Sequence, residues 1–235
     1  MFLFYVPDMA VRPQLPEAEA QHCLKVLRMQ TGDIVHVTDG KGNLYKAALL
    51  ETHPKHCRLD VLETIPHPAR KGQITVALAP TKNMGRMEWL AEKATETGID
   101  AIVFLDCRFS ERKAVQTARI NKILISAMKQ SLKFRLPQLP EMTGFRQFIA
   151  RSFEGQKFIA HCHPGQKHLL SKTYRPGENA LVLIGPEGDF SEEEVESAVQ
   201  QGFVPVSLGE SRLRTETAAL AALQTVHIIN QLSGI

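Results

Sequence analysis

From residue 73 to the end of the chain, short apolar runs alternate with stretches of helical spacing, and this alternation restricts the fold more than any other feature. The apolar runs of strand length lie at 74–79, 101–105, 157–161, 180–184 and 203–208. The stretches with helical spacing lie at 85–97, around 120–128, at 145–152, after 191 and from about 215. Strands that alternate with helices form a mainly parallel sheet covered on both faces. The sequence therefore predicts an α/β domain over residues 73–235.

The helix after residue 191 carries the clearest start signal. Ser191 is followed three residues later by Glu194, which is the spacing of a capping box. Its expected inward residues are Val195, Ala198 and Val199. Its acidic residues are expected to form a solvated face and no catalytic cluster; they are Glu192, Glu193, Glu194 and Glu196.

A basic segment precedes Pro137 and Pro140, which are expected to end its helix. Between Arg108 and Arg135 the chain has eight lysines and arginines and a single acid. The apolar stripe of the expected helix is Ile120, Ile123, Leu124, Ala127 and Met128. A basic helix face can neutralise RNA phosphates. Charge alone leaves an ordinary solvated helix face equally open.

Residues 1–70 follow a different pattern that predicts a small β-barrel domain. Apolar alternation over 34–38 and 45–50 flanks Asp-Gly-Lys-Gly-Asn at 39–43, a strong hairpin signal. A further alternating run lies at 57–62, and residues 17–29 have helical spacing. The proline-containing stretch at 66–72 is expected to link this domain to the domain at 73–235.

Composition excludes several classes of protein. The net charge is +3, and the four cysteines form no CxxC pair, which favours reduced thiols in a cytoplasmic protein. No apolar run approaches the roughly 18 residues of a membrane span, so no membrane partner is expected. Five of the nine histidines lie before Ala69 and share no metal-ligand spacing, and no metal is expected.

Two glycine turns follow two of the last predicted strands. One is Gly-Pro-Glu-Gly at 185–188 and the other begins at Gly209. Both would lie at the carboxyl edge of a parallel sheet, where open α/β sheets bind ligands. Glycine lets a backbone approach a flat ligand closely, although each turn alone could be structural. The chain has neither GxGxxG nor GxxxxGK[ST], so a dinucleotide or P-loop site is disfavoured.

Several motifs, taken together and in their order along the chain, resemble those of the RsmE family of ribosomal RNA methyltransferases, which belongs to the SPOUT superfamily; the C-terminal motifs are given first. Two of them are LVLIGPEGDF at 181–190 and Leu208-Gly209 followed by LRTETAA at 213–219. Others are HCLKVLR at 22–28 with Gly32-Asp33, the segment 82–98, Ser110-Glu111-Arg112 and Gln130-Ser131. The resemblance covers the whole chain.

The resemblance implies a fold and a function. The expected fold is a PUA-like barrel followed by a SPOUT domain whose chain forms a deep trefoil knot. The expected cofactor is S-adenosylmethionine, and the expected reaction is methylation of N3 of a uridine in 16S ribosomal RNA. The expected partners are the small ribosomal subunit and a second copy of the chain. The small residues of the helix after Thr217 would allow close packing beside the cofactor loops and the partner subunit, or simply in the core.

The motifs and turns also assign residues to roles. The expected cofactor-binding residues are Ile184, Gly185, Pro186, Glu187, Gly188, Leu208, Gly209, Leu213, Thr215 and Thr217. Arg214 is expected to stabilise the uridine anion, and Glu216 to accept the proton or orient Arg214, with helix capping as its alternative. The expected RNA contacts are Lys25, Arg28, Arg112, Lys129, Lys133, Arg135 and Arg212.

Two departures from the family pattern and two rival functions complete the sequence-based hypothesis. Position 189 is Asp where Gly is common, and Phe2-Leu3-Phe4 stands where many relatives have an arginine. The segment His161-Cys162-His163 is expected to border the cofactor pocket. The rivals are an RNA-binding protein without catalysis and a flavodoxin-like or Rossmann enzyme with a nucleotide cofactor.

Overall fold

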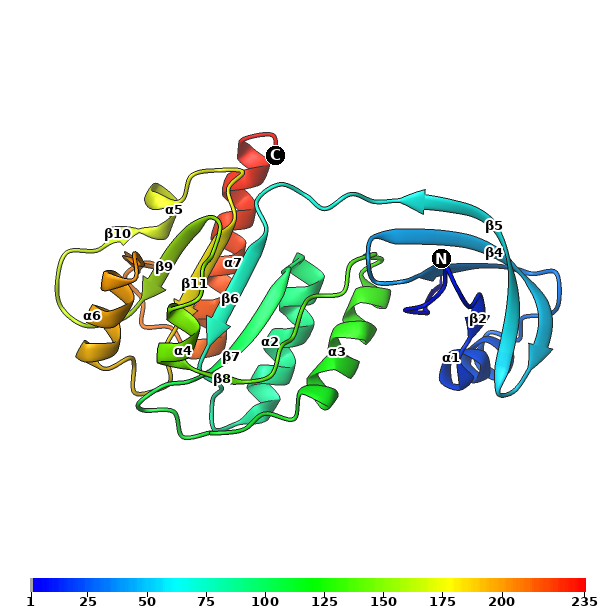
Figure 1. Cartoon of the computed structure of the whole chain (residues 1–235), viewed down its shortest axis with the longest axis horizontal. Coiled ribbons are helices and arrows are strands. Elements are labelled where there is room, and N and C mark those ends of the chain that lie inside the picture. Colours follow the sequence, from blue (N-terminus) through cyan, green and yellow to red (C-terminus); the bar gives the residue numbers. More distant parts are fainter. Residues whose placement is uncertain (1) are drawn as a thin grey trace. The chain divides into compact units, whose positions relative to one another are not determined.

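The computed structural model describes residues 2–235, and the chain divides into two compact units (Figure 1). The first unit contains the chain up to Ala69 together with Ile125–Leu136, and the second contains Arg70–Leu124 and Pro137–Ile235. The change at Ala69 falls within the linker predicted at 66–72. The return of Ile125–Leu136 to the first unit is a feature that the sequence pattern does not predict.

The first unit is built on a five-stranded sheet in the order β1-β3-β4-β5-β2. Its strands are β1 (Leu3–Tyr5), β2 (Gln14–Leu15), β3 (Ile34–Thr38), β4 (Asn43–His53) and β5 (His56–Pro66). The predicted hairpin is confirmed, since β3 and β4 pair antiparallel. Its turn is held by Asp39, whose Oδ1 accepts a hydrogen bond from the backbone N–H of Lys41 at 2.8 Å.

The helix predicted at 17–29 is wrong in length and in kind. Helix α1 (Glu17–Gln21) passes directly into a π-helix, η1 (His22–Val26). A π-helix has the wider i→i+5 hydrogen bond, and here the Leu27 N–H donates to the His22 carbonyl at 3.1 Å. Arg28 then takes a left-handed conformation with φ 56°, which ends the helical segment before Met29.

The second unit contains a seven-stranded sheet in the order β10-β12-β9-β11-β6-β7-β8, and all its neighbouring strands are parallel. Its strands are β6 (Ile74–Leu78), β7 (Ala101–Asp106), β8 (Thr143–Gly144), β9 (Gln156–Ala160), β10 (His168–Leu169), β11 (Ala180–Ile184) and β12 (Val204–Ser207). Every residue of β11 is buried, so both faces of the sheet are covered at its centre. The predicted α/β class is confirmed.

The helices begin and end for local chemical reasons. They are α2 (Met84–Thr97), α3 (Thr117–Gln130), α4 (Phe145–Ile149), α5 (Leu170–Thr173), α6 (Glu192–Gln200) and α7 (Thr215–Leu232). Helix α2 ends at Gly98, as predicted, with a left-handed φ of 103°. Helix α3 ends at Gln130, well before Pro137, and Leu132 follows with a left-handed φ of 53°.

The capping box of α6 is confirmed, with both reciprocal hydrogen bonds between Ser191 and Glu194. Two expectations for this helix are wrong. Val199 is 45% exposed and does not point into the core. Glu194 is only 8% exposed, and its carboxylate also accepts a hydrogen bond from the Arg108 N–H at 2.8 Å. It is a structural group and not part of a solvated face.

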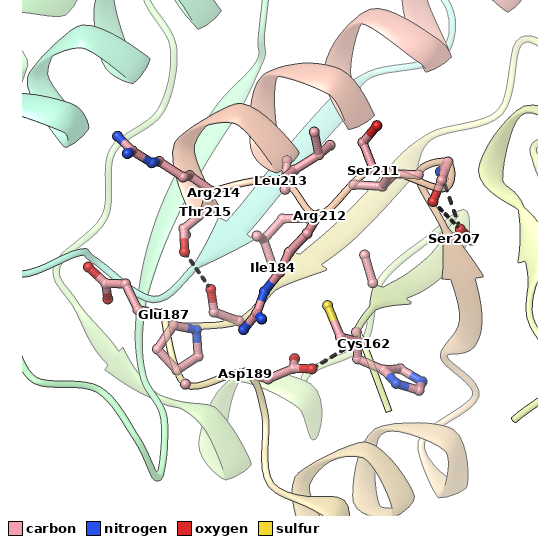
Figure 2. A pocket seen from close by; sticks show the side chains of 18 of the residues that line it. Cys162, Ile184, Glu187, Asp189, Ser207, Ser211, Arg212, Leu213, Arg214 and Thr215 are labelled. Atoms are coloured by element: carbon pink, nitrogen blue, oxygen red, sulfur yellow. Dashed lines mark hydrogen bonds between the residues drawn. The ribbon is translucent and has the colours of Figure 1, made fainter. Parts of the chain in front are cut away.

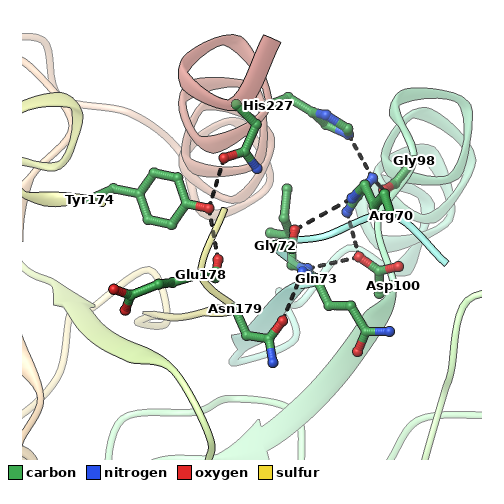
Figure 3. Close-up of polar contacts among 11 residues, drawn as sticks. Arg70, Gly72, Gln73, Gly98, Asp100, Tyr174, Glu178, Asn179 and His227 are labelled. Atoms are coloured by element: carbon green, nitrogen blue, oxygen red, sulfur yellow. Dashed lines mark hydrogen bonds and ion pairs between the residues drawn. The ribbon is translucent and has the colours of Figure 1, made fainter. Parts of the chain in front are cut away.

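A polar cluster fixes the carboxyl-terminal part of α7 against the amino end of β6 (Figure 3). The Arg70 guanidinium forms an ion pair with Asp100 and lies 3.1 Å from Nε2 of His227 on α7. Asp100 also accepts the Ile74 N–H at 2.7 Å. These contacts hold the carboxyl-terminal end of α7, the end opposite to Thr215. Among residues 2–235 no helix is long and apolar enough to cross a membrane.

Candidate active site

A cavity of about 470 Å³ opens at the carboxyl edge of the parallel sheet (Figure 2). The ends of β9, β11 and β12 contribute to it, together with the segment that leads into α7. The expectation from the two glycine turns is confirmed in this respect, since both turns line one cavity. The strand order explains why the two turns lie close together, because β11 and β12 are both neighbours of β9.

Nine of the ten predicted cofactor residues line this cavity. They are Ile184, Gly185, Pro186, Glu187, Gly188, Leu208, Gly209, Leu213 and Thr215. The tenth, Thr217, is exposed one residue beyond the buried Glu216 and lines a neighbouring pocket instead. The cavity also has lining residues that the motifs did not assign; they are Arg86, Ala160, Asp189, Val206, Ser207, Ser211 and Ala218.

A buried hydrogen bond joins the 185–188 turn to the start of α7. The hydroxyl of Thr215, in the first turn of α7, donates to the Gly185 carbonyl at 3.1 Å (Figure 2). Gly185 is itself buried, and a Cβ atom at this position would lie 3.0 Å from the backbone N of Phe190. Only glycine therefore fits this turn without moving the backbone.

Asp189 ties the glycine turn to the end of β9. It has a left-handed φ of 66°, which explains why glycine suits this position. Its Oδ1 accepts the N–H of Phe190 at 2.8 Å. Its Oδ2 accepts the N–H of Cys162 at 2.7 Å (Figure 2). The carboxylate thus offsets the backbone strain with two charge-assisted hydrogen bonds.

We expect the cofactor affinity of Asp189 variants to depend on two effects, the strain of the left-handed backbone and the two hydrogen bonds of the carboxylate. Asp189→Asn should stay nearest to the wild type, since Asn tolerates left-handed backbone and keeps an acceptor. Asp189→Gly removes the strain but also both hydrogen bonds, and Asp189→Ala keeps the strain and loses both bonds. Binding of S-adenosylhomocysteine by calorimetry should weaken in that order, by roughly tenfold for Ala. Equal affinities in all three variants would contradict this role.

His161 and Cys162 line the cavity, as expected for the segment that borders the pocket. Both ring nitrogens of His161 are buried and lack a hydrogen-bond partner among the described residues. Burial, followed by the charge of Lys167, lowers the pKa of His161, which favours the neutral ring. The described residues contain no group of three or more side chains that could hold a metal ion.

Unpaired backbone groups make the cavity suitable for an adenine-containing ligand. Leu208, Ser211 and Leu213 make no hydrogen bond within residues 2–235. All three line the cavity beside Gly209, whose φ of 123° turns the backbone there. Such N–H and C=O groups can pair with the polar edge of a base, while the buried side chain of Ile184 contributes apolar surface.

Arg214 and Glu216 lie on either side of Thr215 at the start of α7. Arg214 is exposed and lines both the cavity and the neighbouring pocket. Glu216 is 7% exposed, and its Oε1 lies 3.7 Å from Nε of Arg86. Among the described residues Glu216 makes no hydrogen bond that caps the helix, so its capping alternative has no support here.

The seven residues predicted to contact RNA differ in exposure and in their partners within the chain. Lys25, Arg28 and Arg212 are exposed. Others already have partners within their own unit: Lys129 pairs with Glu19 at 2.6 Å, Arg135 donates to the His67 carbonyl at 3.0 Å, and Arg112 donates to the Lys82 carbonyl at 2.8 Å. Lys133 is half-buried. Contact of any of them with RNA stays a prediction.

Comparisons with known proteins agree with this architecture. A family model described as an RNA methyltransferase domain matches residues 68–227, and one described as an RNA methyltransferase PUA domain matches residues 15–62. A crystal structure of a probable rRNA-methyltransferase from Porphyromonas gingivalis has a TM-score of 0.94 and 43% identity, covering 99% of this chain and 100% of that one.

Two further relatives carry a more specific name. The ribosomal RNA small subunit methyltransferase E of Neisseria gonorrhoeae, solved with S-adenosyl methionine bound, has a TM-score of 0.84 and 29% identity, with 97% of this chain and 98% of that chain covered. The Bacillus subtilis protein of the same name is 27% identical over 231 residues, 91% of this chain and 89% of its own.

The fold, the cavity and the two family models define the class of the protein, an RNA methyltransferase with an N-terminal PUA domain. Within that class the chain belongs to the RsmE family, whose members match it over nearly their whole length. The α/β fold with a PUA domain is thereby confirmed as the SPOUT type. The trefoil knot stays a prediction.

Proposed function

We propose that the protein transfers the methyl group of S-adenosylmethionine to N3 of a uridine in 16S ribosomal RNA. The observation that carries this proposal is the position of Arg214, which borders both the glycine-turn cavity and a second pocket that contains the buried carboxylate of Glu216. A donor in the cavity and an acceptor in the pocket would share one guanidinium. The N. gonorrhoeae relative was solved with the proposed donor.

The residues present fit S-adenosylmethionine. The unpaired backbone groups of Leu208, Ser211 and Leu213 would hold the adenine. Ile184, Pro186, Glu187, Gly188, Gly209 and Thr215 would complete the cavity wall. When bound, the donor supplies a methyl group already activated on a positively charged sulfur, so the protein contributes chiefly placement on that side.

The acceptor side needs more from the protein. N3 of uridine carries a proton at neutral pH and is a poor nucleophile until that proton leaves. Glu216 would accept the proton at a carboxylate oxygen, and Arg214 would stabilise the negative charge that spreads onto the uracil carbonyl oxygens. Both residues lie at the start of α7, so the helix fixes the separation of their backbones.

The same proposal assigns the remaining partners. Lys25 and Arg28 of the PUA domain, with Arg212 beside the cavity, would contact RNA phosphates, and Arg112, Lys129, Lys133 and Arg135 would add to them. The substrate would be the small ribosomal subunit or its RNA in the cytoplasm. The active form would be a homodimer whose methyltransferase domains each contain a trefoil knot.

Mass spectrometry of the RNA product tests the function. The protein is incubated with small ribosomal subunits that lack the modification and with tritiated S-adenosylmethionine, and the RNA is digested to nucleosides. We expect label in N3-methyluridine alone. Label in another nucleoside would overturn the proposed position. Absence of both transfer and cofactor binding would favour an RNA-binding protein without catalysis.

A further inference from the structure

A second pocket, of about 320 Å³, lies between the first turns of α2 and α7. The sequence motifs gave it no role. Its lining residues are Asn83, Gly85, Arg86, Trp89, Arg214, Glu216 and Thr217. Arg86 and Arg214 line this pocket and also the glycine-turn cavity. A ligand in the pocket would therefore lie next to a ligand in the cavity.

One wall of this pocket has an unpaired acceptor. Glu216 is more than nine-tenths buried, and its Oε2 lacks a hydrogen-bond partner among the described residues. The other oxygen, Oε1, lies 3.7 Å from Nε of Arg86, beyond ordinary hydrogen-bond distance. A buried carboxylate oxygen without a partner costs free energy. A ligand N–H group would remove that cost.

The pocket also has an exposed aromatic side chain. Trp89, the only tryptophan of the chain, is 44% exposed although it lies on a helix whose inner side is buried. Exposed tryptophan beside cationic groups is suited to stacking against a nucleic-acid base. Arg86 and Arg214 supply guanidinium donors to the same space.

We propose that this pocket receives the acceptor base, an inference that rests on the proposed function. The base stacks on Trp89, its N3–H donates to Oε2 of Glu216, and its two carbonyl oxygens accept from Arg86 and Arg214. Uracil has this pattern of one donor between two acceptors. Cytosine has an unprotonated N3, which would place a lone pair against the carboxylate, so the pocket selects uridine over cytidine.

The fluorescence of Trp89 provides a direct test, because no other tryptophan contributes to the signal. Wild-type protein saturated with S-adenosylhomocysteine is titrated with an RNA hairpin that contains the target uridine. Matched hairpins carry cytidine or N3-methyluridine at that position. We expect quenching with uridine and at least about tenfold weaker quenching affinity with the other two. RNA binding, seen by anisotropy, without any change in tryptophan fluorescence would overturn the proposal.

Variants add a second readout. Trp89→Ala should lower kcat/KM for RNA by roughly tenfold or more, while Trp89→Phe retains most activity and both keep wild-type affinity for S-adenosylhomocysteine. Ile228→Ala is the matched control. It removes an exposed apolar side chain on a different helix, α7, and should change none of these values. Arg86→Ala should weaken RNA binding and reduce the preference for uridine over cytidine.

The outcomes separate this inference from the proposed function. N3-methyluridine formed at the wild-type rate by Trp89→Ala would overturn the base pocket and leave the function intact. No methyl transfer by the wild-type protein would overturn the function. Sedimentation of each variant provides the last comparison: a Trp89→Ala protein that loses its dimeric state while its monomer retains RNA affinity would assign Trp89 to the subunit interface and overturn the pocket.

Discussion

Replacement of Arg214 by alanine should reduce methyl transfer by about 100- to 1,000-fold, the range found when one fixed donor to a developing negative charge is removed. The residue is exposed at the start of α7, so no core packing is lost. Affinity for S-adenosylhomocysteine should stay within a few-fold of wild type, because the cavity keeps its backbone groups. Single-turnover assays and calorimetry measure the two quantities separately.

Arg214→Lys is the matched variant, since it retains the charge and loses the planar pair of donors. We expect it to recover only part of the activity, because lysine cannot place two donors as arginine does. Near-normal turnover of Arg214→Ala would remove Arg214 from the mechanism. A large loss of cofactor affinity in the same variant would assign the residue to the donor site instead.

Replacement of Gly185 by valine should weaken binding of S-adenosylhomocysteine by roughly 100-fold, given the usual cost of overpacking a rigid site. The new Cβ would lie 3.0 Å from the Phe190 nitrogen and 3.2 Å from the Asp189 carbonyl carbon. Both are backbone atoms, so the turn itself must move. That movement would also break the hydrogen bond from Thr215.

Gly144→Ala is the control for a glycine replacement as such. Gly144 has φ −64°, and no atom lies within 4 Å of the position that an alanine methyl group would take, so alanine fits there without strain. Cofactor affinity and melting temperature should both stay near wild type. If Gly185→Val bound the cofactor as well as Gly144→Ala does, the glycine turn would not be the cofactor site.

Much of the methyltransferase domain could be predicted from sequence because its signals are local. Strand 180–184 is a continuous apolar run between polar segments, and the structure places β11 there. The capping box at Ser191 needs only residues three positions apart. The helix predicted at 17–29 failed because apolar spacing does not separate an α-helix from the π-helix that η1 forms.

Long-range contacts account for what the sequence could not predict. Residues 125–136 belong with the first unit because the Phe134 carbonyl accepts the Gly42 N–H at 2.8 Å and the Leu136 N–H donates to the Gly40 carbonyl at 2.8 Å. No periodicity within the segment encodes those partners. The glycine turns could be assigned to one cavity, whereas Arg86 and Trp89 could not, since only the folded chain brings α2 beside α7.

The hydrogen bond from the Thr215 hydroxyl to the Gly185 carbonyl couples the proposed donor site to the first turn of α7. A disturbance of the glycine turn would travel through that link to the two side chains flanking Thr215. A variant of the glycine turn could therefore still bind the methyl donor and yet transfer the methyl group slowly, because the Arg214 guanidinium and the Glu216 carboxylate would be displaced.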